Sequence, residues 1–400
     1  MPATVVRIIT RLNIGGPSIQ AIRLTTDLPA LGYATILLHG QLGAGEGDML
    51  QLMSVAGANL QQIARLGRPI RPLDDLHAFM TIFHLLRCLR PDIVHTHMAK
   101  AGLLGRLAAI LYNRTSGRAR RVRIIHTYHG HVLEGYFSSW MTRTFIGLER
   151  ALARGTDVLI AISPRIRDGL VGRFHIGRAE QFQIVPLGLD LARLAAIDAN
   201  DRAAARRTLG LDDDALVVTT VGRLTAVKNH RLLLEAAEIV ARRVTRAMFV
   251  IAGDGELRPD LEKQAAALGI ANRVRFLGWR GDLPVIYAAS DIVAISSHNE
   301  GTPVALIEAM AAAVPGVSTA VGGVPDLVRD GVTGVLTPAG RADAFAAAVE
   351  RLLTDDAGRL EMGRRARQSV VEAYDIRRLV DDIDRLYRSL LIERDAVASA

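Results

Sequence analysis

Short apolar runs alternate with longer amphipathic segments along the chain. In the first half, the runs that predict strands cover residues 5–10, 35–39, 92–96, 123–127, 158–162 and 182–185. In the second half, they cover residues 216–221, 247–252, 274–277, 291–295 and 316–320. Strands that alternate with helices predict an α/β fold, in which helices cover both faces of a parallel sheet. Ligands of such sheets bind at the carboxyl ends of the strands.

One polar stretch, rich in Ala and Arg, separates the two halves and predicts two domains. Four hundred residues exceed what a single compact core usually holds. We expect a first domain at residues 1–190 and a second at residues 191–374. The tail repeats apolar positions at spacings of three and four residues, which predicts one more amphipathic helix at about 375–395. Two placements of this helix remain open, on the second domain or back on the first.

Candidate binding chemistry follows the fourth predicted strand of the second half. The turn after it contains Glu300, Gly301 and Pro303, and Val304 begins a predicted helix that carries Glu308. A helix N-terminus offers free N–H groups and the positive end of the helix dipole, so it binds anions. Carboxylates accept hydrogen bonds from hydroxyls, so a ligand with both sugars and phosphates would use both features. The simpler alternative is that Glu300 caps the helix and Glu308 is solvated.

Glycine-containing turns follow the first predicted strand of each half. Gly15 and Gly16 allow the backbone to approach a phosphate or a sugar closely, because no Cβ is in the way. In the second half, Gly222 is followed by Arg223 and Lys228. Arginine supplies a planar fork and lysine a point charge, and together they can clamp a pyrophosphate. The chain has only three lysines, which favours a specific role for Lys228.

The two glutamates, in the setting Glu-Gly-Thr-Pro…Glu-Ala-Met, resemble the signature of the retaining glycosyltransferases of family 4. Three further motifs are similar to that family: Gly-Arg-Leu…Lys at 222–228, Gly-Asp-Gly-Glu at 253–256 and Thr-Tyr-His-Gly at 127–130. The resemblance covers nearly the whole chain. One departure lies at 313–317, where Ala-Val-Pro-Gly-Val replaces the usual Gly-x-Pro-Val-Val. Each displaced glycine is expected to cost roughly 1 kcal/mol.

The resemblance implies a GT-B fold, with two Rossmann-like, doubly wound domains that face each other across a cleft. The first domain, completed by the final helix, would bind the acceptor, and the second would bind a nucleotide sugar. UDP is the expected nucleotide because it is the commonest in the family. The reaction would retain the anomeric configuration. No nucleophile stands out, which suits a front-side substitution in which the leaving phosphate helps to deprotonate the acceptor.

The resemblance also implies roles for the candidate residues. Glu308 would hold ribose hydroxyls, and Glu300 would hold hydroxyls of the donor sugar. Arg223 and Lys228 would neutralise the departing diphosphate, so neither a metal ion nor another cofactor is expected. The remaining expected donor contacts are Gly15, Gly16, Gly301, Thr302, Pro303, Val304 and Leu277. His129 would point towards the donor sugar and could donate to a hydroxyl or a phosphate, with His131 as a second candidate.

The net charge of +8 and the sequence pI of about 10.1 favour anionic partners. Aromatic residues make up only 4% of the chain, which leaves little to stack bases on, so nucleic acid is not an expected partner. The single cysteine, Cys88, rules out a disulfide framework within the chain and fits a reducing cytoplasm. Neither a signal peptide nor an apolar segment long enough to span a bilayer is visible. We therefore expect a cytoplasmic protein, either free or at the inner surface of the plasma membrane.

Residues 133–145 are aromatic and basic, with Trp140 and Arg143 among them. Three interpretations remain open: an interfacial contact with an anionic membrane, a wall of the acceptor pocket, and ordinary core. A membrane contact would fit a lipid-linked sugar or another cell-envelope glycan precursor as the acceptor. His95 and His97 lie on one face of a strand, but no third metal ligand with suitable spacing is evident. The Asp-Asp-Asp run at 212–214 is expected to be a solvated turn.

Two other functions remain alternatives to glycosyl transfer. A nucleotide-sugar epimerase or a sugar phosphorylase can share the GT-B fold, but an epimerase needs no acceptor and a phosphorylase uses free phosphate. A non-catalytic scaffold that binds nucleotide sugar belongs to a different class. It would bind a donor tightly without glycosylating any acceptor.

Overall fold

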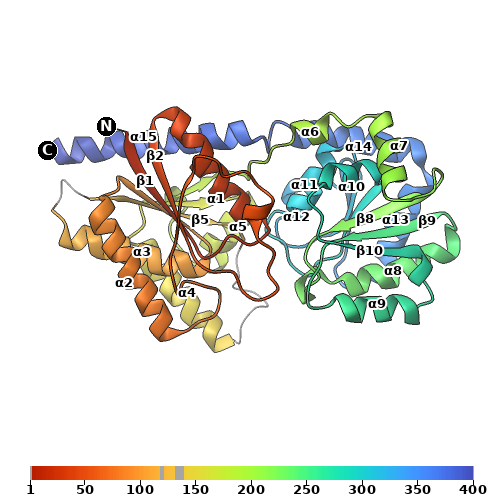
Figure 1. Ribbon diagram of the computed structural model, residues 1–400, viewed down its shortest axis with the longest axis horizontal. Helices are drawn as coiled ribbons and strands as arrows, with labels where there is room; N and C mark the ends of the chain where they lie inside the picture. Colours follow the sequence, from red (N-terminus) through yellow and green to blue (C-terminus); the bar gives the residue numbers. More distant parts are fainter. Residues whose placement is uncertain (1, 118–120, 131–138, 400) are drawn as a thin grey trace. The chain divides into compact units, whose positions relative to one another are not determined.

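The computed structural model describes residues 2–117, 121–130 and 139–399 (Figure 1). The chain forms two compact units. The first contains Met1–Leu189 together with Ile376–Ala400, and the second is the continuous segment Asp190–Asp375. In the described part of the chain, every helix is too short or too polar to span a bilayer.

The first unit is built on a parallel sheet in the order β3-β2-β1-β4-β5-β6-β7. Its strands are β1 (Ala3–Ile9), β2 (Tyr33–His39), β3 (Asn59–Gln62), β4 (Ile93–His97), β5 (Arg123–Tyr128), β6 (Val158–Ala161) and β7 (Phe182–Ile184). Its α-helices are α1 (Gly16–Asp27), α2 (Pro72–Leu89), α3 (Ala99–Thr115), α4 (Ser139–Ala153), α5 (Pro164–Asp168) and α15 (Ile376–Ser399). Apolar side chains of α2 and α3 pack on one face of the sheet. Those of α1 and α15 pack on the other face.

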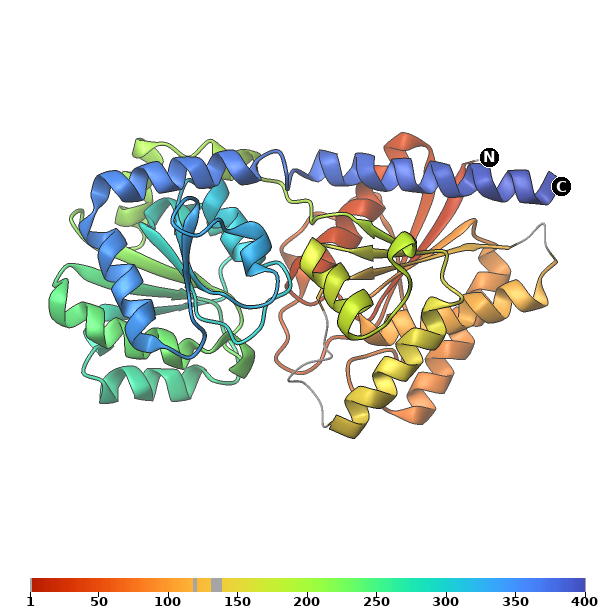
Figure 2. The same cartoon turned by 180° about the vertical axis from the view of Figure 1, so that it is seen from behind.

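The final helix, α15, packs on the first unit, which decides between the two placements that the sequence left open (Figure 2). Its predicted apolar stripe is buried at Ile376, Leu379, Ile383, Leu386 and Leu390. Contact with the chain before the domain boundary is close, because a Cβ on Gly188 would lie 2.4 Å from the Cβ of Leu379. Tyr387 also extends a hydroxyl into the unit, where it accepts a hydrogen bond from Arg7 (3.3 Å).

The second unit is built on a parallel sheet in the order β10-β9-β8-β11-β12-β13. Its strands are β8 (Leu216–Val221), β9 (Ala247–Ala252), β10 (Val274–Gly278), β11 (Ile292–Ile295), β12 (Gly316–Thr319) and β13 (Gly334–Thr337). Its α-helices are α6 (Ala192–Ala195), α7 (Ala199–Thr208), α8 (His230–Arg243), α9 (Arg258–Ala267), α10 (Leu283–Ala289), α11 (Val304–Ala311), α12 (Val324–Leu327), α13 (Ala342–Thr354) and α14 (Asp356–Val370). Both sheets are therefore parallel, as the alternation predicted, and Rossmann-like, as the family resemblance implied.

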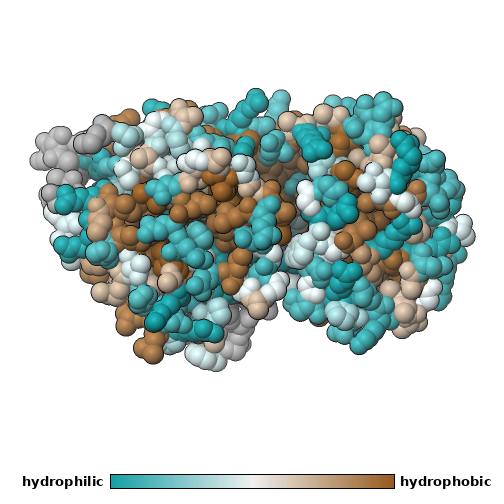
Figure 3. All heavy atoms as spheres, viewed as in Figure 1, coloured by the Kyte–Doolittle hydropathy of each residue, from teal (hydrophilic) through white to brown (hydrophobic). Residues whose placement is uncertain are grey.

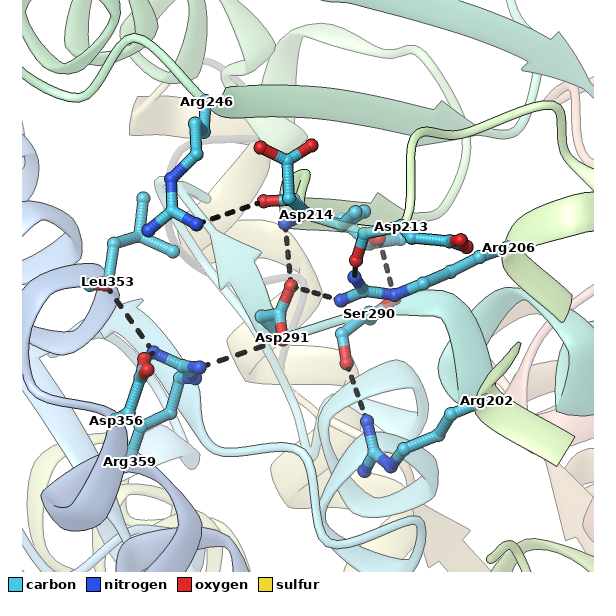
Figure 4. A network of polar contacts seen from close by, with 12 residues as sticks. Arg202, Arg206, Asp213, Asp214, Arg246, Ser290, Asp291, Leu353, Asp356 and Arg359 are labelled. Atoms are coloured by element: carbon cyan, nitrogen blue, oxygen red, sulfur yellow. Dashed lines mark hydrogen bonds and ion pairs between the residues drawn. The ribbon is translucent and has the colours of Figure 1, made fainter. Parts of the chain in front are cut away.

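An arginine network holds α7 and α14 against the sheet of the second unit (Figure 4). Asp291, just before β11, accepts hydrogen bonds from the guanidinium of Arg206 (2.7 Å) and from the amide of Val217 (2.8 Å). Arg359 lies 3.8 Å from the same carboxylate. The aspartates at 212–214 are exposed, and the backbone carbonyls of Asp213 and Asp214 accept hydrogen bonds from Arg206 and Arg246. This placement agrees with the expected solvated turn.

The departure at 313–317 has a visible structural consequence. Ala313 follows α11 with φ of +56°, the left-handed conformation in which an alanine is strained by roughly 1 kcal/mol relative to glycine. Gly316 begins β12, and a Cβ there would lie 2.2 Å from the Cδ1 of Leu306. The glycine in the strand therefore makes room for a leucine of the preceding helix.

Candidate active site

The strand order of the second sheet reverses between β8 and β11, which are neighbours in space but not in sequence. At such a switch point the two following loops diverge and leave a crevice for ligands. The loops are residues 222–229 and 296–303. They are tied together because the amide of His298 donates to the carbonyl of Val227 (2.8 Å). The hydroxyl of Ser296 also donates to the carbonyls of Lys228 and Asn229 (3.2 and 3.0 Å).

Lys228 and Glu300 form an ion pair across these loops, with 2.7 Å between Nζ and Oε1. The Ser297 hydroxyl donates to the same carboxylate oxygen (2.6 Å). The Glu300 side chain is only 8% exposed, whereas that of Lys228 is 29% exposed. The lysine therefore holds a buried carboxylate in place and retains access to solvent. The sequence predicted both residues but not their pairing, because it assigned them to different parts of the ligand.

Glu300 does not cap α11. Pro303 is the N-cap residue, and no side chain of the described residues caps this helix. The turn is instead fixed from the loop after β12, because the amide of Gly323 donates to the carbonyl of Glu300 (3.1 Å). A Cβ on Gly322, whose φ is +52°, would lie 1.8 Å from the same carbonyl oxygen. The first N–H groups of α11 have no partners within the helix. They therefore come only a few residues after the Glu300 carboxylate, which is held in place.

Glu308 lies on α11 and is partly buried rather than fully solvated. Burial raises the pKa of Glu308 to about 7, although the hydrogen bond from Tyr287 acts in the opposite direction. The donor of that bond is the Tyr287 hydroxyl on α10, 2.7 Å from Oε2. Sequence analysis missed Tyr287. The available signal was a tyrosine in an apolar helix, since a buried tyrosine hydroxyl usually needs a partner.

Arg223 follows β8 and is partly buried. Among the described residues, no hydrogen bond or ion pair of its side chain is found. The backbone at Gly222, just before Arg223, packs directly against the backbone at Gly253, because a Cβ on Gly253 would lie 1.9 Å from the carbonyl oxygen of Gly222. The glycine motif at 253–256 therefore has a packing role beside the site. Leu277, partly buried near the carboxyl end of β10, lies two strands away from β8.

In the first unit, the candidate His129 follows β5 and contacts His97 at the end of β4 (Nε2 to Nδ1, 3.0 Å). Burial lowers the pKa of His129 to about 3 and holds that of His97 well below its ordinary value. Both rings are therefore neutral at pH 7, and one donates to the other. His95 stacks on His97 with 4.3 Å between ring centroids. Among the described residues, no group of three or more metal-ligating side chains is found.

Gly16 is the first residue of α1 and Gly15 is its N-cap residue, close after β1. Gly15 has a φ of +156°, and its carbonyl accepts the amide of Ser18 (3.1 Å). His131 and residues 133–138 lie outside the described residues. Of the aromatic and basic segment, the described part begins α4, where Trp140 is 67% exposed.

Comparison with known proteins places this chain in a family. The profile of "Glycosyl transferases group 1" matches residues 201–369, and that of "Glycosyltransferase Family 4" matches residues 14–193. An Escherichia coli UDP-Gal:alpha-D-GlcNAc-diphosphoundecaprenol alpha-1,3-galactosyltransferase is 31% identical, over 83% of this chain and 84% of that protein. The chain belongs to glycosyltransferase family 4. This glycosyltransferase is also 29% identical to the D-inositol 3-phosphate glycosyltransferase of Corynebacterium diphtheriae, over 88% of this chain and 84% of the relative.

Solved structures confirm the fold of this family 4 enzyme. Anabaena Alr3699/HepE, in complex with UDP and glucose, has a TM-score of 0.82 at 22% identity and covers 97% of this chain and 100% of its own. The sucrose-phosphate synthase of Thermosynechococcus elongatus has the same TM-score and identity, with coverage of 98% and 100%. Both neighbours are GT-B glycosyltransferases, so the predicted GT-B fold is confirmed.

Proposed function

We propose that this enzyme transfers a sugar from a UDP-sugar to an acceptor carried on a lipid diphosphate, with retention of configuration and without a metal ion. The observation that carries the proposal is the Lys228–Glu300 pair at the switch point, next to the N-terminus of α11. It joins a fixed carboxylate, which accepts hydrogen bonds from hydroxyls, to a cation and a helix N-terminus, which suit phosphate.

The second unit would hold the donor. In this proposal, Glu300 accepts hydrogen bonds from the transferred sugar, and Glu308 accepts them from the ribose. Lys228 and Arg223 lie on the same loop, where they would share the diphosphate with the N–H groups of residues 301–304. Leu277 would border the base. Positive charge from two side chains and a helix N-terminus is the electrostatic stabilisation that a leaving diphosphate needs, and this supports metal independence.

Residues of the first unit would complete the reaction. We assign Gly15 and Gly16 to the diphosphate and His129 to the donor sugar. The Nε2 of His129 already contacts His97, whereas its Nδ1 has no hydrogen-bond partner among the described residues, so we assign the Nδ1 to the ligand. As a neutral ring it can donate to a hydroxyl without adding a fixed charge. The acceptor hydroxyl would lose its proton to the leaving phosphate, so the protein need not supply a base.

Two comparisons support the acceptor and the donor. The name of the E. coli relative specifies UDP-Gal as the donor and a diphosphoundecaprenol-linked GlcNAc as the acceptor. HepE was solved with UDP. The names of the relatives also specify glycosyl transfer, which favours it over the epimerase, phosphorylase and scaffold alternatives. A lipid-linked acceptor would bring the enzyme to the cytoplasmic surface of the plasma membrane.

The test is a thermal-shift panel of UDP-, GDP- and ADP-sugars on wild type, Arg223→Ala and the control Arg243→Ala, whose guanidinium pairs with Glu350 on an exposed surface. A ligand that binds only the native state raises the melting temperature. We expect UDP-sugars to stabilise the wild type and the control. Loss of one charge-assisted contact, roughly 1.5–3 kcal/mol, should weaken binding to Arg223→Ala about 10- to 150-fold. Equal shifts in all three proteins would contradict the assigned clamp.

Transfer itself is measured with the best donor and a short-chain GlcNAc-diphosphoprenol. NMR of the product gives the anomeric configuration, and the assay is repeated in EDTA. A β-linked product from an α-linked donor, or loss of activity in EDTA that added metal restores, would contradict retention or metal independence.

A further inference from the structure

The positive charge of the chain is concentrated in one segment of the first unit. Residues 65–154 contain fifteen Arg and Lys against five Asp and Glu, a net charge of +10, whereas the whole chain has a net charge of +8. The rest of the protein is therefore slightly acidic. This segment contains α2, α3 and α4.

The same three helices expose an unusual share of large hydrophobic side chains. Within the described residues, thirteen such side chains are exposed, and seven of them lie on these helices, which make up 50 of the 400 residues. They are Leu73, Leu76, Met80, Leu107, Leu111, Trp140 and Leu148. Leu73 is 81% exposed. Figure 3 shows hydrophobic residues over much of the first unit on the side where α2 and α3 lie.

Helix α2 shows how the exposed residues are arranged. Ala78 and Ile82 are buried against the sheet, four residues apart. Leu73, Leu76 and Met80 recur at spacings of three and four on the opposite face of the helix, which points to solvent. Packing in the core therefore explains why one stripe of α2 is apolar. It does not explain why the opposite, exposed stripe is apolar as well.

The exposed residues of the three helices share one side of the sheet. Helix α2 packs along α3, and α3 packs against α4, so the three form one layer (Figure 1). We call the outer surface of this layer the helical face. Exposed arginines belong to it as well: Arg87 and Arg90 on or after α2, Arg114 on α3, and Arg143 and Arg154 on or after α4. The helical face thus carries both exposed hydrophobic side chains and exposed arginines.

We propose that the helical face binds the surface of an anionic membrane. Apolar side chains can enter the boundary between headgroups and acyl chains while arginines pair with lipid phosphates. Each basic residue near an anionic surface contributes roughly 1 kcal/mol, which is about a fivefold gain in binding. A uniformly anionic surface matches a segment with three basic residues to each acidic one better than a protein partner does, because protein surfaces usually mix both signs.

This inference rests on the proposed lipid-linked acceptor, which resides in a membrane. The helical face would keep the enzyme at that surface while the acceptor diffuses in two dimensions. It extends the membrane interpretation of residues 133–145 to α2 and α3, where the exposed apolar stripe is longest.

The experiment is vesicle co-sedimentation of the full-length protein. The variant is Leu73→Glu/Leu76→Glu/Met80→Glu, and the control is Leu360→Glu/Ile392→Glu, which changes two exposed hydrophobics outside the helical face, on α14 and α15. We expect wild type and control to bind vesicles with 30% phosphatidylglycerol (a chosen composition) and to bind neutral phosphatidylcholine vesicles at least about tenfold more weakly. The variant should bind the anionic vesicles more than about tenfold more weakly than wild type. Raising the NaCl concentration should weaken the binding of wild type.

Trp140 provides a second readout. The chain has two tryptophans, so Trp279→Phe leaves Trp140 as the only tryptophan, which can be excited selectively at 295 nm (a chosen wavelength). Anionic vesicles should shift its emission to the blue, and lipids brominated near the headgroup should quench it. An unshifted, unquenched spectrum would overturn the placement of α4 in the interface.

Several outcomes would overturn the proposal. They are equal binding to neutral and anionic vesicles, and unchanged binding of the triple variant. A third outcome is that the wild type is a dimer, the triple variant is a monomer, and neither protein binds vesicles. That result would assign the helical face to a second copy of the chain. Failure of the proposed function looks different: vesicle binding persists, but no sugar reaches either a membrane-bound or a water-soluble acceptor. If both proposals hold, the triple variant keeps its activity on a water-soluble acceptor analogue and loses activity on acceptor in vesicles.

Discussion

Folding disfavours the ionised form of Glu308. The substitution Glu308→Gln removes this ionisable group and should therefore change how the stability depends on pH. The pKa of Glu308 is about 7 in the folded protein and is 4.5 in the absence of structure. Between pH 4.5 and pH 7 this carboxyl binds a proton in the folded protein but not in the unfolded chain, so the free energy of unfolding falls as the pH rises. Stability is therefore lost as the pH rises from 4.5 towards 7. A difference of about 2.5 pKa units corresponds to at most about 3 kcal/mol.

Buried histidines act in the opposite direction in the wild type, so the comparison must be made between the two proteins. Burial lowers the pKa of five histidines: His95, His97, His126, His129 and His230. Below pH 6.5 the unfolded chain binds protons at these rings and the folded protein does not, so each adds stability as the pH rises to 6.5. These contributions cancel when wild type and Glu308→Gln are compared at one pH.

The measurement is urea unfolding of both proteins between pH 5 and pH 8. A Trp140→Phe background leaves Trp279, which follows β10, to report on the second unit. Glutamine can still accept the hydrogen bond from Tyr287, so packing is conserved. We expect the free energy of unfolding of Glu308→Gln, relative to wild type, to increase by about 2–3 kcal/mol from pH 5 to pH 8. A difference that stays constant within about 0.5 kcal/mol would refute the argument that burial controls this carboxyl.

Two further substitutions test the packing inside each unit. Arg106 is fully buried and paired with Glu149 (2.7 Å), so Glu149→Ala should leave an uncompensated charge and lower the free energy of unfolding by about 3–5 kcal/mol; a urea titration that shows less than about 1 kcal/mol would contradict this. Gly253→Ala should cost about 3 kcal/mol or more, because its Cβ would lie 1.9 Å from the carbonyl of Gly222. Gly269→Ala is the control: φ is also positive there but nothing lies within 4 Å, so only about 1 kcal/mol is expected by calorimetry.

Strands with a marked apolar run could be predicted from the sequence, and edge strands could not. The runs at 216–221 and 247–252 coincide with β8 and β9. Missed were β3 and β13, which lie at the edges of their sheets. The first reads Asn-Leu-Gln-Gln and is mostly exposed, so it has no apolar signal to detect. The second is four residues long and begins with a glycine, which predicts a turn rather than a strand.

The candidate site was predictable as a set of residues but not as a set of contacts. Motif spacing indicated Arg223, Lys228, Glu300 and Glu308, and all four lie on loops or a helix after β8 and β11. Their partners depend on which strands are neighbours. Lys228 and Glu300 are 72 residues apart in sequence, and only the strand order brings their loops together. The pKa of Glu308 likewise depends on packing around α10 and α11, which no local pattern encodes.

The return of α15 to the first unit sets an order of events during synthesis. The second unit is one uninterrupted segment, so it can close as soon as it leaves the ribosome, whereas the first unit waits for Ile376–Ala400. At about 5–20 residues per second, the roughly 200 residues from Asp190 to Ala400 take about 10–40 s to make. During that interval the face of the first sheet on which α1 and α15 pack lacks α15, and Arg7 lacks the hydroxyl of Tyr387. The part of this enzyme translated first is therefore completed last, and chaperones have this interval in which to bind it.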